Sequence, residues 1–351
     1  MLKRNGRRLQ IFDNNYFNYL IAIFAILHQM SEVDSSSALN EARLLGLNQP
    51  SRDLKTGGEY EGLEFWQENN ALFSQAWSEL PKLHPELYEY NSEFQARFIN
   101  PQLKEAVEKL RLSFTESKLD DETVNESEIQ ALLQRSQVVH DVFHFKQEFG
   151  LFTKEFCNLL LEELDYLSHS GVPMRRPNGM NRYGAILDQI GFNPVFEGIV
   201  KDYIRPLGEM IFPEHISSND AAESYSFIVD YQKELDESST EFDVDLKEHR
   251  DSSVATLNVC LGYDNFTGGN IAFREDELGA IGQNSKGTGE VSMKPGLALI
   301  HKGQHRHAAL PLESGRRVNL IIWLMGEDGY VRVAPHPVHE QLAARDRWQK
   351  K

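Results

Sequence analysis

The chain is poor in the features that mark several large classes of protein. Its 351 residues include two cysteines, Cys157 and Cys260, and no Cys-x-x-Cys pair. Both cysteines lie within apolar patterns, so we expect buried thiols and neither a disulfide nor a cysteine-bound zinc ion. Lysine and arginine number 36 against 53 aspartate and glutamate residues, giving a formal net charge of −17. This shortage of positive charge argues against duplex nucleic-acid binding, which depends on basic side chains that contact phosphates.

The apolar run at residues 19–27 is too short to cross a bilayer, which takes about 20 apolar residues. Four basic residues precede it, an order that resembles a secretory signal: Lys3, Arg4, Arg7 and Arg8. No small-x-small cleavage site follows the run, because His28 comes next. We therefore expect a packed helix, no transmembrane span and an intracellular, cytoplasmic protein. The lumen of the endoplasmic reticulum is the alternative.

The chain divides into regions of different pattern. Residues 1–135 are polar and helical in character, with apolar residues at three- and four-residue spacing in Glu61–Leu80 and Leu103–Phe114. An acidic, serine-containing linker is expected at residues 117–128. A second helix is expected to begin after the N-cap residue Thr153 and to end near Gly171. After Phe196 the pattern shifts towards strands.

Short strands are expected at residues 226–231, 254–261, 296–300 and 317–324. The last is apolar on both faces, so one face should line an interior while the other meets supporting helices. Several strands after a helical segment indicate an α+β protein with a two-sheet jelly roll.

The most informative motif is His249-Arg-Asp251, because a His-x-Asp pair places two metal ligands on one face of an extended strand. His307, after a later apolar strand, would complete a set of two histidines and one carboxylate. Such a facial set leaves coordination positions open and is typical of non-haem Fe(II) oxygenases. His305 is the runner-up for the second histidine, while His301 ends a strand and is expected to pack.

A cosubstrate carboxylate would need a cation near the metal. Arg317 shares a strand face with Asn319, Ile321 and Trp323, whereas its neighbour Arg316 points to the other face. A guanidinium fork binds both oxygens of a carboxylate, which favours Arg317 as the anchor for a 2-oxoacid. Two further residues are candidates for the same pocket, Tyr231 through its hydroxyl and Asn258 through its amide; a structural role is equally open for each.

These residues resemble the 2-oxoglutarate- and Fe(II)-dependent oxygenases of the prolyl 4-hydroxylase type. The likeness is closer to the family of 2-oxoglutarate and iron-dependent oxygenase domain-containing protein 2. It covers residues 138–324, with a weaker echo at 84–103. The segments that carry it include Arg176-Pro-Asn-Gly-Met-Asn181, Thr256-Leu-Asn-Val259, Phe266-Thr-Gly-Gly269 and His301-Lys-Gly303.

The resemblance implies a double-stranded β-helix domain at residues 138–330, with its metal and oxoglutarate core at 225–326 and a tail at 331–351. It also implies Fe(2+) held by His249, Asp251 and His307, 2-oxoglutarate at Arg317, and L-ascorbate as a further cofactor. The expected activity is hydroxylation of a peptidyl (prolyl or lysyl) or other C–H substrate, with dioxygen consumed and succinate and CO2 released. The partner would be a peptide or protein and not a nucleic acid.

Two other functions stay open on the sequence. One is a cupin-like binding protein, and the other is a catalytically silent oxygenase fold that serves as an interaction module. One departure from the family also matters, because residues 232–248 form a long acidic loop where many members have a shorter turn. This loop could close over the site or attract a basic substrate, or it could be solvated and mobile.

Overall fold

The computed structural model describes residues 37–48, 66, 68–116, 133–135, 142–145, 150–178, 180–213, 216, 224–233, 242–263, 265–274 and 288–325. Several expected features lie outside these residues: the apolar run 19–27, the acidic linker 117–128, residues 234–241 of the acidic loop, and the tail 331–351. None of the helices within the described ranges is both long and apolar enough to span a membrane.

Two antiparallel sheets form the centre of the molecule. The larger has eight strands, in the order β1-β2-β10-β6-β12-β4-β3 with β7 paired to β12, and the smaller has the order β5-β11-β8-β9. The larger sheet contains β1 (Leu133–Arg135), β2 (Val142–Phe145), β3 (Gly184–Ile186), β4 (Ser224–Lys233), β6 (Ala255–Gly262), β7 (Thr267–Gly268), β10 (Ala298–Lys302) and β12 (Leu312–Leu324). The smaller contains β5 (Leu246–His249), β8 (Ile271–Arg274), β9 (Thr288–Val291) and β11 (His307–Ala309). All four strands expected from the sequence are therefore present.

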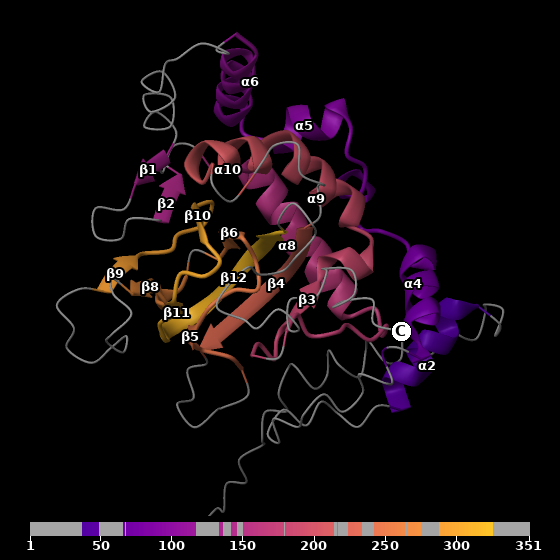
Figure 1. The fold of residues 1–351 in the computed structure, drawn as a ribbon. Coiled ribbons are helices and arrows are strands. Elements are labelled where there is room, and N and C mark those ends of the chain that lie inside the picture. Colours follow the sequence, from indigo (N-terminus) through magenta and orange to yellow (C-terminus); the bar gives the residue numbers. More distant parts are fainter. Residues whose placement is uncertain are drawn as a thin grey trace, which may run out of the picture.

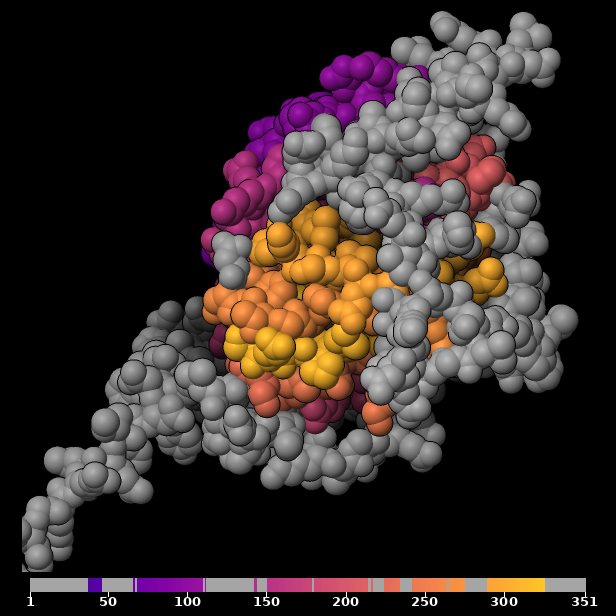
Figure 2. Space-filling model, turned by 90° about the vertical axis from the view of Figure 1, so that its left-hand side faces the viewer, coloured from indigo at the N-terminus to yellow at the C-terminus, as the bar shows by residue number. Residues whose placement is uncertain are grey.

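Helices cover one face of the larger sheet, and the smaller sheet lies on the other side (Figure 1). They are α2 (Ala38–Asn48), α4 (Asn70–Glu79), η1 (Pro85–Leu87), α5 (Ser92–Phe98), α6 (Pro101–Glu116), α8 (Lys154–Ser168), η2 (Leu187–Ile190), α9 (Asn193–Ile199), η3 (Val200–Ile204) and α10 (Arg205–Ile211). After a quarter turn, Figure 2 shows the orange and yellow atoms of the later strands across the middle of one face. The purple atoms of the N-terminal helices lie at its upper edge.

Strand β12 shows why the sequence is apolar on both of its faces. Val318, Leu320, Ile322 and Leu324 belong to the core that includes the helices. Ile321 and Trp323 belong to a second core between the two sheets, where Arg317 and Asn319 line a cavity. The alternation read from the sequence is confirmed, and it directs Arg317 to the interior between the sheets.

Helix α8 begins and ends where its sequence predicts. The side chain of Thr153 accepts a hydrogen bond from the amide of Phe156 at 3.3 Å, which caps the first turn. Gly171 follows the helix with a φ of 81°, a conformation that side chains with a Cβ rarely adopt. Cys157 in α8 and Cys260 in β6 are both buried free thiols, as expected.

The expected change to strands directly after Phe196 is wrong. The chain stays helical from Asn193 to Ile211, through α9, one turn of π-helix (η3) and α10. The run Ile199-Val-Lys-Asp-Tyr-Ile204 is rich in residues that favour strands, but its apolar members are buried in the helical core. Tertiary burial has therefore outweighed local β propensity.

The N-terminal helices share one hydrophobic core with the sheet. Phe94 and Phe98 of α5 contact Phe156 of α8, with ring centroids 5.8 and 5.7 Å apart. Trp77 of α4 lies in the same cluster as Leu320 of β12. Helices from residues before 135 thus buttress the strands that carry the site, while the domain boundary near residue 135 stays a prediction.

A buried carboxyl at the junction of η2 and β4 should make stability depend on pH. Burial raises the pKa of Asp188 to about 7, and its Oδ1 has no hydrogen-bond partner. Both folded and unfolded chains hold this proton below pH 4, but only the folded chain holds it between pH 4 and 7. Stability contributed by the group is therefore lost as pH rises to 7.

Asp188→Asn should remove this loss, which is at most about 4 kcal/mol for a shift of this size. We expect the free energy of unfolding, measured by urea denaturation at pH 4.5 and 8, to fall less in the variant than in the wild type. Asp165→Asn, which changes an exposed carboxyl, is the control. An equal fall in Asp188→Asn and wild-type protein would contradict the assignment.

Candidate metal centre

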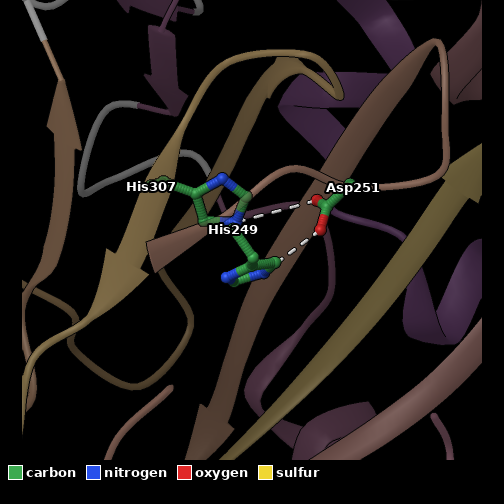
Figure 3. Close-up of side chains that lie close together, drawn as sticks. All are labelled: His249, Asp251 and His307. Carbon is green, nitrogen blue, oxygen red and sulfur yellow. Dashed lines mark ion pairs between the residues drawn. The ribbon is translucent and has the colours of Figure 1, made fainter. Parts of the chain in front are cut away.

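The structure brings His249, Asp251 and His307 together. Their candidate ligand atoms all lie within 4.8 Å of one another. The Nε2 atom of His249 is 3.4 Å from Oδ1 of Asp251, and Nε2 of His307 is 3.8 Å from Oδ2 (Figure 3). His249 is the last residue of β5 and pairs in register with His307, the first residue of β11. Strand pairing therefore sets the two imidazoles side by side.

Backbone carbonyls fix the protonation of both rings. Nδ1 of His249 contacts the Lys247 carbonyl at 2.8 Å, and Nδ1 of His307 contacts the His305 carbonyl at 2.9 Å. A carbonyl can only accept, so Nδ1 of each ring carries a proton, and in the neutral form of the ring Nε2 has a free lone pair on the side of Asp251. Burial lowers the pKa of His307 to about 3, which keeps this ring neutral. Neutral imidazoles with a free Nε2 are the form that binds a metal ion.

Asp251 is held in place by its own neighbours. It is 5% exposed, and its amide donates to the Gly303 carbonyl at 2.8 Å. The hydroxyl of Thr256 donates to Oδ2 at 2.6 Å, and Ser253 contacts the same hydroxyl at 2.8 Å. One carboxylate oxygen is thus engaged, while Oδ1 stays directed at His249. Hydrogen-bond partners of this kind commonly orient the side chains that bind a metal ion.

Removing the hydroxyl of Thr256 should weaken metal binding. We expect Thr256→Val to raise the dissociation constant for Fe(II) by about 10- to 100-fold, because the carboxylate loses its orienting bond. Thr256→Ser keeps the hydroxyl and should bind like the wild type. Calorimetric titration with Fe(II) under nitrogen measures both variants. Equal weakening in the two would show that packing, and not the hydrogen bond, matters at this position.

Arg317 is a buried cation without a carboxylate partner among the described residues. Its side chain is 1% exposed, Nη1 donates to the Gly269 carbonyl, and Nε has no partner among the described residues. Burying an unpaired charge is costly, so such a site is suited to an anionic ligand. Arg316 instead binds Asp230 through two contacts of 3.0 and 2.7 Å. The structure therefore separates the two arginines as strand alternation predicted.

The structure places Tyr231 and Asn258, the two further candidates, in the cavity lining. Tyr231 is opposite Arg317 in the β4–β12 ladder, and the centroid of its ring is 4.8 Å from the guanidinium carbon. Asn319 donates through its amide to Oδ1 of Asn258, so the amide nitrogen of Asn258 is left for another partner. Both side chains line the same cavity as Arg317.

A single cavity of about 480 Å³ joins the histidine–aspartate cluster to Arg317. This volume falls within the roughly 300–1,000 Å³ range of small-molecule and cofactor sites. Apolar side chains from both sheets form much of its wall: Phe227, Val229, Leu246, Ile271, Ala309, Ile321 and Trp323. The cavity therefore offers a largely apolar compartment that holds both a candidate metal-binding cluster and a candidate anion-binding group.

The other nearby histidines are not part of the group of candidate ligands, although Nε2 of His301 is 3.8 Å from Oδ2 of Asp251. Nε2 of His305 contacts the Arg274 carbonyl at 2.8 Å. His301 is fully buried and packs against Phe273 and His307, with ring centroids 5.1 and 4.6 Å apart. The geometry thus favours His307 over its runner-up His305.

Two contributors to the site were missed in the sequence. Thr256 shares a strand face with Asn258, so alternation alone could have placed it beside Asp251. Asn181 donates to the Tyr231 hydroxyl at 3.3 Å, across 50 positions of sequence. No local pattern predicts that contact, because it depends on the tertiary structure that brings Asn181 to the cavity.

Several known proteins are similar in sequence to this chain. Residues 77–217 match the model of the OGFOD2-like domain. The 2-oxoglutarate and iron-dependent oxygenase domain-containing protein 2 of Danio rerio is 31% identical over 289 residues, which is 81% of this chain and 76% of that protein. The chain belongs to this family. The match to the OGFOD2-like domain begins at residue 77, whereas the resemblance in the sequence motifs began at residue 84.

Other relatives align over shorter stretches. The oxygenase domain-containing protein ICU11 of Arabidopsis thaliana is 36% identical over 50% of this chain and 44% of its own length. The multifunctional procollagen lysine hydroxylase and glycosyltransferase LH3 of Rattus norvegicus is 26% identical over 49% of this chain and 22% of its own. A crystal structure of a Pseudomonas putida prolyl-4-hydroxylase aligns with 65% of this chain and 97% of its own at 11% identity, with a TM-score of 0.36. The family assignment rests on the sequence relatives.

Proposed function

We propose that this protein is an Fe(II)- and 2-oxoglutarate-dependent dioxygenase that hydroxylates a C–H bond of a peptidyl substrate. The observation that carries the proposal is one cavity with two chemically distinct parts. One part is the cluster of His249, Asp251 and His307, and the other is the buried, carboxylate-free Arg317. We assign the reaction to a double-stranded β-helix domain at residues 138–330.

The donor set fits a ferrous ion, because two neutral imidazoles and one carboxylate would occupy one side and leave open positions for cosubstrates. Arg317, with Tyr231 and Asn258 beside it, would hold the distal carboxylate of 2-oxoglutarate. When bound, iron and 2-oxoglutarate supply the oxidation, in which one atom of dioxygen enters succinate and the other the substrate, with loss of CO2. Ascorbate is proposed as the reductant that keeps the metal ferrous.

The chain's own contribution is geometry and exclusion of water. Carbonyls at Lys247 and His305 keep both imidazoles in the ligating tautomer, and Thr256 orients the carboxylate. Apolar walls from both sheets keep the reacting groups away from solvent, which strengthens the electrostatic hold of Arg317 on an anion.

The substrate class is proposed from kinship. A procollagen lysine hydroxylase aligns with about half of the chain, which favours a peptidyl lysine or proline over a free small molecule. The chain spans 44% of the ICU11 protein and 22% of LH3, so the whole activity of those proteins is not carried over. The cytoplasm is the proposed compartment, with the endoplasmic reticulum as the alternative suggested by residues 19–27.

Titration of 2-oxoglutarate into the Fe(II)-loaded full chain without oxygen tests the proposal. Chelation of iron by a 2-oxoacid produces a visible charge-transfer absorption, which should appear in the wild type and be lost in His307→Ala. Iron binding without this absorption would favour a cupin-like binding protein. Chelation without later succinate formation, whichever peptide is added, would favour a silent interaction module.

A further inference from the structure

The described lining of the cavity holds more arginines than carboxylates, although the chain is strongly acidic. The lining residues include three arginines, Arg175, Arg250 and Arg317, against a single carboxylate, Asp251. The formal net charge of the whole chain is −17. A bound ferrous ion and a 2-oxoglutarate dianion would cancel each other, so the lining would keep its excess of positive charge after both have bound. Low-dielectric walls intensify such a local field.

Three nearby carboxylates that do not line the cavity are already bound in ion pairs. Asp243 binds Arg182 at 2.7 Å, Glu248 binds Arg306 at 2.9 Å, and Asp230 binds Arg316. Two carboxylates of the acidic stretch 232–248, Asp243 and Glu248, are therefore bound to arginines of the protein itself. These pairs do not neutralise the arginines that line the cavity.

Arg175 is a lining arginine whose charge is not balanced by a carboxylate among the described residues. It is half-buried, and no hydrogen bond or ion pair joins it to the other residues that the structure describes. Arg317 is also without a carboxylate, but the 2-oxoglutarate of the proposed function would supply one. Once that cosubstrate is bound, Arg175 remains as a cation without a carboxylate partner among the described residues, and a second ligand could pair it.

The segment that carries Arg175 is fixed to the sheet. The carbonyl of Pro177 accepts from the Tyr225 hydroxyl at 2.8 Å, and Asn181 donates to the Tyr231 hydroxyl. Asn178 accepts from the amides of Met180 and Asn181, both at 2.8 Å, which closes the turn. Arg175 is thus presented by a braced wall of the cavity. Such rigidity lowers the entropic cost of binding.

We propose that Arg175 binds an anionic group of the substrate, a carboxylate or a phosphate, close to the position that is oxidised. This inference rests on the proposed function and narrows its substrate to an acidic or phosphorylated peptide. Met180, which is 47% exposed and lines the same cavity, offers an apolar contact next to that anion. The preference is opposite to the basic substrate that the acidic loop suggests from sequence alone.

Fluorescence polarisation with labelled peptides tests the proposal on the full chain, loaded with Fe(II) and 2-oxoglutarate under nitrogen. Four matched peptide sets each hold a proline or lysine, flanked by glutamate, glutamine, lysine or phosphoserine. We expect glutamate or phosphoserine peptides to bind about 10-fold more tightly than the glutamine set, the usual scale of a charge-assisted contact. The glutamate and phosphoserine sets separate a carboxylate from a phosphate ligand.

Three variants locate the effect. Arg175→Gln should abolish the preference, Arg175→Lys should keep part of it, and Arg176→Gln, the same change outside the cavity lining, should keep all of it. Thermal melting confirms that each variant is folded. Equal binding of all sets, a preference for lysine, no binding of any set, or an equal loss in Arg176→Gln would overturn the proposal.

Binding and turnover separate the two levels of inference. Arg175-dependent binding of acidic peptides without succinate formation would refute the dioxygenase function and leave the anion site standing. Succinate formation that is stimulated best by neutral or basic peptides would support the dioxygenase and refute the anion site.

Discussion

Replacing Asp251 by alanine is expected to abolish succinate formation from 2-oxoglutarate. The side chain is the one carboxylate in the described cavity lining, and it faces the free Nε2 atoms of His249 and His307. Without it, two neutral imidazoles would remain to hold a divalent cation, which is too few ligands for a stable Fe(II) site. Succinate, measured by chromatography, should fall to the level found without protein, and Fe(II) affinity should fall with it.

Asp230→Asn is the control for this experiment. Like Asp251→Ala, it removes a carboxylate. Asp230 lies in β4 of the larger sheet, and its carboxylate binds Arg316 outside the cavity. Fe(II) binding and turnover should be close to those of the wild type in Asp230→Asn. Wild-type turnover in Asp251→Ala would show that the cluster is not the metal centre.

Replacing Arg317 by glutamine should raise the KM for 2-oxoglutarate by about 10²- to 10³-fold. Loss of one partner from a buried charge pair costs roughly 2–5 kcal/mol, and each 1.4 kcal/mol corresponds to a tenfold change in affinity. Fe(II) affinity should change little, because the guanidinium lies beside Tyr231 and is not one of the clustered ligand groups. Initial rates of succinate formation at varied 2-oxoglutarate measure the effect.

Arg316→Gln is a matched control, since it makes the same change one residue away on the opposite face of β12. That side chain is bound to Asp230 and does not line the cavity. Its KM for 2-oxoglutarate should be within about threefold of the wild type, as expected for partly exposed ion pairs that contribute less than about 1 kcal/mol. Similar KM increases in both variants would remove Arg317 as the specific anchor.

The strand face on which each site residue lies could be predicted from the sequence, because side chains alternate along a strand. This alternation separates Arg317 from Arg316 and places Asn258 on the cavity side of β6. The His249-x-Asp251 spacing was likewise enough to bring two ligand candidates together. The structure adds that β5 ends at His249, so Asp251 lies just beyond the strand.

Other features depend on contacts that no local pattern encodes. The pairing of β11 with β5 distinguishes His307 from His305, since it sets His307 directly opposite His249. The hydrogen bond from Asn181 to Tyr231 and the exposure of Arg175 to the cavity arise from the tertiary structure around Arg175 and Asn181. The helix from Asn193 to Ile211 was missed because its β-branched residues imitate a strand until the core they enter is known.

The role of the N-terminal helices also emerged only in three dimensions. Spacing predicted the helix near Leu103–Phe114, which α6 confirms, but it could not show what that helix contacts. Leu103 and Val107 are buried in the core that also holds Leu257 of β6 and Ile322 of β12. The helices therefore support the sheet from the face opposite the cavity.

A single-turnover measurement tests the dioxygenase assignment most directly. The full chain, loaded with Fe(II) and 2-oxoglutarate under nitrogen, is mixed with oxygenated buffer and the peptide sets, and succinate is quantified per iron. Succinate stoichiometric with iron is expected in the wild type, and none is expected in His307→Ala. A wild-type protein that binds iron and 2-oxoglutarate tightly, yet yields no succinate with any peptide set, would contradict the dioxygenase assignment.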